Sequence, residues 1–65
     1  EYQLALKDLN QSLQHKPDYA KAHLNRGLVY YQMDQTDRAC IDFQNACDHG
    51  DCDGTKWAMK NAICR

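Results

Sequence analysis

The sequence predicts an all-α fold of about four antiparallel helices, and three observations lead to this prediction. Apolar residues recur at spacings of three and four, which is the pattern of amphipathic helices. A proline and clusters of turn-forming residues divide the chain into segments of helix length. No segment shows a strand pattern. With 65 residues, the chain makes at most one small domain with a thin core.

The first helix is expected over residues 1–15. Its apolar stripe comprises Leu4, Ala5, Leu9, Ser12 and Leu13. Pro17 ends this helix, because proline disfavours helical geometry in the residue before it. Asp18 is then placed to cap a second helix over residues 19–32. The residues that mark the pattern of this second helix are Ala20, His23, Leu24, Gly27, Leu28, Tyr30 and Tyr31.

A third helix is expected over residues 37–48, with Thr36 as its cap and Asp37 favourably placed at the positive end of the helix dipole. Its inward residues are Ala39, Cys40, Phe43, Ala46 and Cys47. A turn cluster over residues 49–54 follows, in which Asp53 is placed to cap a last helix over residues 54–64. The residues that mark the last helix are Thr55, Trp57, Ala58, Ala62, Ile63 and Cys64.

The chain also resembles itself after a shift of 34 residues. This shift aligns Ala5 with Ala39 and Leu9 with Phe43. Identities are few, but residue size and polarity recur helix by helix. Within the repeat, Gly27 and Ala39 are the small residues expected to let the backbones of the second and third helices approach closely.

A helix-turn-helix period of 34 residues with the pattern W-x2-L-G-x2-Y, A-x3-F and P is the tetratricopeptide signature. This sequence matches it at Gly27, Tyr30, Ala39 and Phe43, so the chain resembles the tetratricopeptide repeat (TPR) family over essentially its whole length. The resemblance implies an α-solenoid with a right-handed superhelix. The implied units are the second helix of a truncated repeat over 1–17, a complete repeat over 18–51 and a C-terminal capping helix over 52–65.

The sequence departs from the family pattern at four positions. His23 replaces the aromatic residue, Arg26 the leucine, Asp51 the closing proline and Asn61 the glycine of the last helix. We therefore expect the last helix to be a solvent-facing cap. Because the chain opens at Glu1 within a helical pattern, we expect a C-terminal piece of a longer protein. The expected source is a bacterial protein of this family, in keeping with the disulfides predicted below.

The resemblance implies a non-catalytic interaction or scaffold module that binds a peptide or a partner protein in its concave groove. The residues expected to line the groove are Lys21, Leu24, Asn25, Leu28 and Gln32, with Tyr31 near its edge. Asn25 stands where many family members hydrogen-bond an extended peptide, and the alternative is a solvated or helix-packing amide. Lys21 is placed to meet a carboxylate, but a complete carboxylate clamp is not expected because Thr55 and Met59 stand at the equivalent positions of the last helix.

Composition argues against several other classes of function. The net charge is −1 with both signs interspersed, which predicts neither a nucleic-acid partner nor an anionic membrane surface. The longest apolar run covers residues 28–31, so no membrane insertion is expected in this segment. The histidines are scattered and no nucleophile stands beside a base, so we expect neither an enzyme nor a cofactor. A further type of partner is a second copy of the chain, bound through the exposed ends of the solenoid.

Four cysteines allow three disulfide pairings, and the geometry of the predicted helices decides between them. Cys52 and Cys64 would lie about 15 Å apart along the last helix, beyond the Cα separation of about 7 Å that a disulfide allows. Cys40 and Cys47 lie two turns apart on one helix and are excluded for the same reason. Both exclusions remove the same pairing. Two antiparallel helices joined by a turn centred near Cys52 place Cys40 opposite Cys64, and Cys47 can meet Cys52 across the helix end. We therefore predict a disulfide between Cys40 and Cys64 and another between Cys47 and Cys52.

Disulfides indicate an oxidising compartment, so we expect a secreted or periplasmic protein. In the first alternative the protein is cytoplasmic and its cysteines are reduced core residues. In the second, Cys47, His49, Cys52 and Cys64 bind zinc, although we assign no metal site. The alternative function is accordingly a redox- or zinc-responsive, cysteine-rich structural cap of a larger protein.

Overall fold

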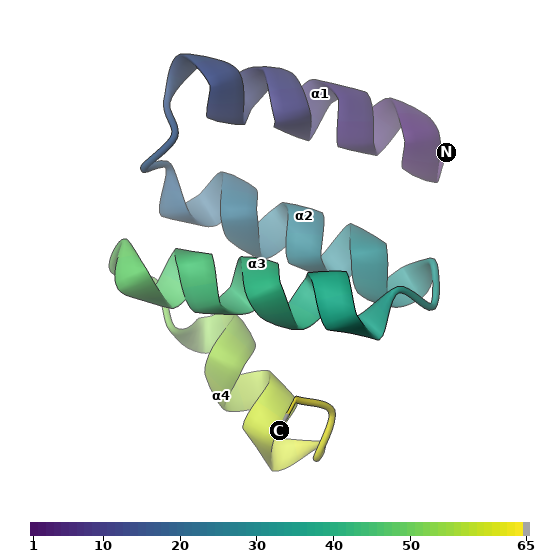
Figure 1. The fold of residues 1–65 in the computed structure, drawn as a ribbon, viewed down its shortest axis with the longest axis vertical. Helices are drawn as coiled ribbons and strands as arrows, with labels where there is room; N and C mark the ends of the chain where they lie inside the picture. Colours follow the sequence, from purple (N-terminus) through teal and green to yellow (C-terminus); the bar gives the residue numbers. More distant parts are fainter. Residues whose placement is uncertain (65) are drawn as a thin grey trace.

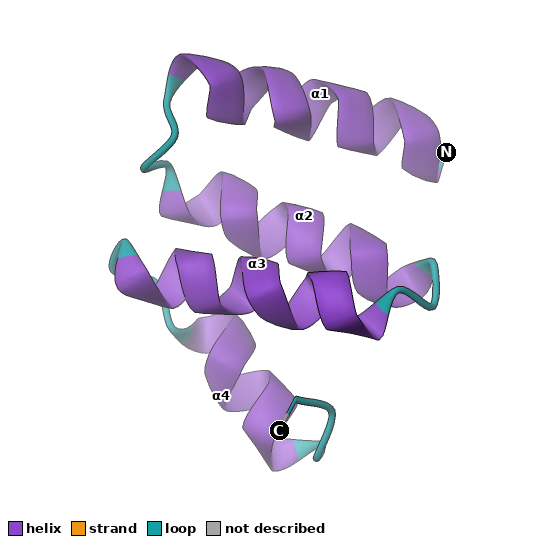
Figure 2. Cartoon of the chain, viewed as in Figure 1, coloured by secondary structure: helices purple, strands orange, loops and turns teal. Residues whose placement is uncertain are grey.

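The computed structural model describes residues 1–64 of the chain. Figures 1 and 2 show α-helices joined by short loops, with no strand in the described residues. The helices are α1 (Tyr2–His15), α2 (Ala20–Gln32), α3 (Thr36–Asp48) and α4 (Asp53–Lys60). The predicted all-α fold of four helices is therefore confirmed.

Helix α2 lies at the centre of the arrangement. It packs against α1 and α3 and also contacts α4, which in turn packs against α3. Figure 1 shows that α1 and α2 run antiparallel, as do α2 and α3, so that successive helices lie side by side. The molecule measures 30 × 25 × 13 Å, and its shortest dimension is close to the diameter of one helix. Each helix therefore presents a long face to solvent.

The core surrounds Phe43, whose side chain is only 1% exposed. Ala39 and Ala46 lie one turn before and after Phe43 on the same side of α3, and both are completely buried. Leu24 of α2 and Ala58 of α4 complete this cluster. Three helices thus meet around one aromatic ring, as the predicted inward positions of the third helix required.

Two glycines allow the helices to approach this ring. A Cβ atom added to Gly27 would lie 2.7 Å from Phe43 Cε1 and 3.1 Å from the carbonyl oxygen of Ala39. A Cβ atom added to Gly54 would lie 2.5 Å from Phe43 Cδ1 and 2.6 Å from Leu24 Cδ1. The prediction that Gly27 and Ala39 permit a close approach of two helices is confirmed.

We expect Gly54→Ala to lower the free energy of unfolding by about 1–3 kcal/mol, because the added methyl group overpacks the core against Phe43 and Leu24. An alanine that meets no obstacle would instead stabilise a helix by about 0.4–1 kcal/mol. Chemical denaturation measures the change. Lys56→Ala, at an exposed position of the same helix, is the matched control. A variant Gly54→Ala as stable as the native chain would contradict the close packing described above.

Three of the four helices end in the same way. The residues Asp34, Gly50 and Ala62 follow α2, α3 and α4 and have positive φ angles of 62°, 107° and 55°. In each case the next amide donates to a carbonyl oxygen five residues earlier, for example Ile63 to Ala58 over 2.9 Å. This Schellman geometry satisfies carbonyl groups that would otherwise lack a partner. It also reverses the chain direction at each helix end.

The predicted extent of the last helix was wrong. Helix α4 ends at Lys60, whereas the prediction extended it to Cys64. The left-handed conformation of Ala62 turns the chain back, and Ile63 and Cys64 pack against the core cluster. The apolar spacing continues through this segment because Ile63 and Cys64 are partly buried against the core after the turn, so the pattern alone does not reveal the helix end.

The predicted side-chain caps were also wrong. Tyr19, Gln35 and Cys52 occupy the N-cap positions of α2, α3 and α4, and none of them forms a capping hydrogen bond through its side chain. The residues expected as caps, which lie next to these positions, were Asp18, Thr36 and Asp53. At the start of α4 the carboxylate of Asp51 instead accepts a hydrogen bond from the backbone amide of Asp53 over 3.1 Å.

The packed face of α1 differs from the predicted stripe. Leu6 and Leu13 are buried, whereas Leu4 is 62% exposed. Among the described residues, α1 packs only against α2, so the side of α1 that faces α2 decides burial. This also explains why Leu9 is less buried than Phe43, its equivalent in the repeat, which α2 and α4 both cover.

Candidate functional site

Four of the five predicted peptide-binding residues lie on the exposed side of α2. Lys21, Asn25, Leu28 and Gln32 recur at spacings of four, three and four, so helical geometry places them along one line of the surface. All four are exposed, and Leu28 retains 40% of its accessible surface. The structure therefore brings these four side chains together.

Leu24, the fifth predicted residue, does not lie on this surface. Its side chain is buried in the core cluster with Phe43 and Ala58. Its Cδ1 atom lies where a side chain on Gly54 would begin, so α4 covers it. The prediction for Leu24 is wrong because the spacing of residues on α2 does not indicate which edge of its apolar stripe a later helix covers.

Helix α4 adds an aromatic side chain that the sequence analysis did not include among the residues of the binding surface. Trp57 remains 37% exposed, and its ring meets that of Tyr31 edge to face with centroids 5.1 Å apart. Tyr31 is 36% exposed and lies one turn beyond Leu28 on α2. We call the surface formed by Lys21, Asn25, Leu28, Tyr31, Gln32 and Trp57 the α2–α4 face.

Lys21 already has a carboxylate partner within the chain. Its ammonium group lies 3.1 Å from the carboxylate of Asp51, in the turn between α3 and α4. The backbone amide of Asp53 and, to a lesser degree, the Lys21 ammonium hold the pKa of Asp51 below its ordinary value. Because the carboxylate is charged at neutral pH, this end of the α2–α4 face is electrically balanced.

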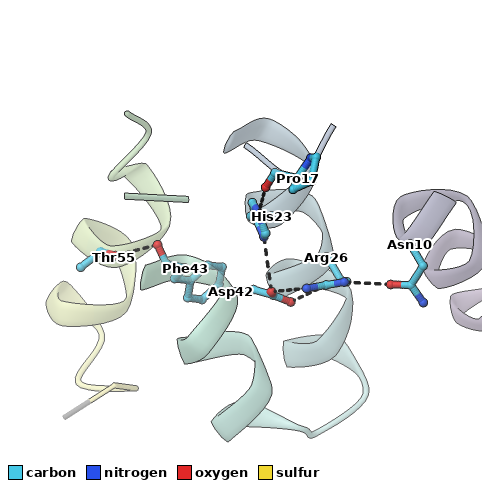
Figure 3. Close-up of polar contacts among 7 residues, drawn as sticks. All are labelled: Asn10, Pro17, His23, Arg26, Asp42, Phe43 and Thr55. Atoms are coloured by element: carbon cyan, nitrogen blue, oxygen red, sulfur yellow. Dashed lines mark hydrogen bonds and ion pairs between the residues drawn. The ribbon is translucent and has the colours of Figure 1, made fainter. Parts of the chain in front are cut away.

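A polar network on the other side of α2 connects three helices. The guanidinium group of Arg26 donates two hydrogen bonds to Asp42 of α3, over 2.9 and 2.8 Å, and a third to Asn10 of α1 over 2.9 Å. Figure 3 shows Arg26 between these two partners. The side chain of Asp42 is only 3% exposed. Its hydrogen bonds raise the pKa of Arg26 above the ordinary value, although partial burial opposes this shift.

His23 belongs to the same network. Its Nε2 atom donates to the carbonyl oxygen of Pro17 over 2.8 Å, and its Nδ1 atom lies 3.8 Å from Asp42 without a hydrogen bond (Figure 3). Its ring stacks on that of His49, with centroids 5.6 Å apart. The sequence had predicted His23 as a residue at an aromatic packing site, and it is buried there.

The four cysteines lie in two pairs at disulfide distance. Cys40 of α3 pairs with Cys64, which follows the turn after α4, and their Cα atoms are 5.7 Å apart. Cys47 pairs with Cys52 between the end of α3 and the start of α4, with a Cα separation of 3.9 Å. These are the pairs that the sequence predicted, although Cys64 lies beyond α4 and not on it.

Over residues 1–64, no three or more histidine, cysteine, aspartate or glutamate side chains are grouped so that they could hold a metal ion. Within the same residues, each helix is too short or too polar to cross a lipid bilayer. The residues of the zinc alternative are not assembled, because Cys47 and Cys52 face each other and Cys64 faces Cys40.

A family model described as TPR repeat matches residues 1–34. The matched segment is about half of the chain and contains α1 and α2 completely. No curated protein and no solved structure matches the chain significantly.

Proposed function

Because the chain belongs to the tetratricopeptide repeat family, we propose that it is an interaction module that binds a peptide or a partner protein on the α2–α4 face. Repeats of this family are typically non-catalytic, and membership of the family suggests that the chain binds other proteins. Within this proposal, residues 18–51 form a complete repeat, residues 1–17 supply the second helix of the preceding one, and residues 52–65 form the cap.

The observation that carries the proposal is the exposure of Leu28, Tyr31 and Trp57 next to one another on this face. Large apolar side chains that remain exposed in a contiguous group mark interaction sites more often than singly scattered ones do. Asn25 lies one turn before Leu28, and its amide group can both donate and accept a hydrogen bond. The face therefore combines apolar contact with the polar groups that an extended peptide backbone requires.

We expect Leu28→Ser to weaken peptide binding by about tenfold and Asn25→Ala by several-fold, since each removes a contact at the centre of the face. Peptides selected from a displayed library against the native chain are the ligands, and titration calorimetry measures their affinity. Both residues are exposed, so the free energy of unfolding should change by less than about 1 kcal/mol.

Lys7→Ala on α1, at an exposed position outside the α2–α4 face, is the control and should leave the affinity unchanged. If neither substitution on the face alters the affinity, the peptides bind elsewhere and the proposal fails.

A second candidate function is a redox-responsive cap, and the two cysteine pairs favour it. The pair of Cys40 and Cys64 holds the segment after α4 against α3, so its reduction would release that segment. In this view the chain stabilises one end of a larger protein and the α2–α4 face has no ligand. Peptide binding that depends on Leu28 distinguishes the first function from the second.

A further inference from the structure

We propose that the α2–α4 face selects an acidic, extended segment of a protein partner, which places one large apolar side chain against Leu28, Tyr31 and Trp57 and its carboxylates beside Lys60. This inference rests on the proposed function, because it names the chemistry of the ligand at the same face.

The apolar anchor follows from three side chains on two helices. Tyr31 and Trp57 bring α2 and α4 together through an edge-to-face contact of 5.1 Å, and each keeps more than a third of its surface exposed. Leu28 extends this surface by one turn of α2 and is 40% exposed. Aromatic residues dominate the binding energy of interfaces because they bury a large area with little loss of conformational freedom. A single leucine or phenylalanine of a ligand can touch all three side chains.

The charge of this surface differs between its two ends. At the end where α2 begins, Lys21 is paired with Asp51 at 3.1 Å, and Asp53 lies close by in the first turn of α4. This end therefore offers no excess positive charge to a ligand. A carboxylate that approached Lys21 would have to compete with Asp51.

At the opposite end the charge is positive. Lys60 lies one turn after Trp57, in the last turn of α4, and is exposed. Lys56 is also exposed but lies nearer the start of the helix, one turn after Asp53. Over residues 1–64 neither ammonium group lies within ion-pair distance of a carboxylate. The positive charge thus stands next to the exposed aromatic pair, where a ligand carboxylate beside the anchor residue would meet it.

The test uses Trp57 as the reporter, because it is the sole tryptophan of the chain. Short synthetic peptides with one phenylalanine flanked by glutamates are titrated into the native chain, and the change of tryptophan emission gives the affinity. Three matched peptides replace the phenylalanine with serine, the glutamates with glutamine, or the glutamates with lysine. We expect each of these changes to weaken binding by about tenfold or more, and added salt to weaken the acidic peptide most.

The variant Lys60→Gln should lower the affinity for the acidic peptide several-fold and reduce its salt dependence, since a charge at the rim of an interface acts mainly through long-range attraction. It should leave the glutamine peptide unaffected. Lys7→Gln on α1 is the matched control and should change neither peptide.

The outcomes separate the ligand chemistry from the function itself. If the glutamine or lysine peptide binds as tightly as the acidic one, or Lys60→Gln has no effect, the inference is overturned while binding at the face stands. If library selection yields basic or entirely polar peptides whose binding requires Leu28, the same conclusion holds. If no peptide of any composition binds through Leu28, both the inference and the proposed function fail.

Discussion

Replacing Arg26 with leucine, the residue of the family pattern, should lower the free energy of unfolding by about 3–5 kcal/mol. The substitution leaves the carboxylate of Asp42, 3% exposed, without its two hydrogen bonds from the guanidinium group. It also removes the hydrogen bond from Arg26 of α2 to Asn10 of α1. A chain of this length has a total stability of roughly 3–10 kcal/mol, so the variant should be largely unfolded at moderate temperature. Circular dichroism and urea denaturation measure the effect.

The double variant Arg26→Leu with Asp42→Leu keeps this prediction testable even if the single variant does not fold. Replacing both members of a buried ion pair with apolar residues is often close to neutral, so the double variant should regain most of the lost stability. Lys7→Leu, on the exposed surface of α1, is the control and should shift stability by about 0.5 kcal/mol at most. Additive losses in the double variant would show that Arg26 and Asp42 are not energetically coupled.

Removing the pair of Cys40 and Cys64 by two alanine substitutions should lower the free energy of unfolding by about 2–4 kcal/mol. The bond joins two cysteines with a sequence separation of 24, and it holds Cys64 and Ile63 against the core. The pair of Cys47 and Cys52, with a separation of 5, should contribute about 1 kcal/mol less, because a shorter loop constrains the unfolded chain less. Urea denaturation of the two double variants measures the difference.

Intact mass establishes whether these bonds form. The non-reduced chain should be lighter than the reduced chain by four hydrogen atoms, two for each bond, and digestion should link Cys40 to Cys64 and Cys47 to Cys52. Alkylation of all four thiols without reductant would contradict the pairing. The cysteines would then be ordinary residues of the protein interior, and the expectation of an oxidising compartment would lose its basis.

Local chemistry explains why the helices themselves were predictable. The spacing of apolar residues follows the helical period wherever one side of a helix is buried, and Pro17 interrupts that pattern at a single point. The repeat of 34 residues, with Gly27 opposite Phe43, likewise indicates how two neighbouring helices pack. The cysteine pairs could be predicted because helix length excludes the pairing of Cys40 with Cys47 and of Cys52 with Cys64, and two antiparallel helices joined by a turn near Cys52 place Cys40 opposite Cys64.

Three details of the site could not be predicted in this way. Leu24 lies in the core and Trp57 joins the exposed face, because α4 covers one edge of the α2 stripe and leaves the tryptophan at the border. Arg26 departs from the family leucine, and its role became visible only with Asp42 beside it, 16 residues away in sequence. The available signal was an acidic residue on the facing helix, but periodicity does not specify such a pair.

The sequence by itself therefore determined the class of fold, the number and order of the helices, the family, and which cysteines pair with each other. The tertiary structure decided which helix edges are covered, where α4 ends and which charged groups neutralise each other, as Lys21 and Asp51 do. The physical reason is that helical periodicity is a property of consecutive residues. Burial and ion pairing depend instead on segments that are distant in sequence and meet only after the helices have packed.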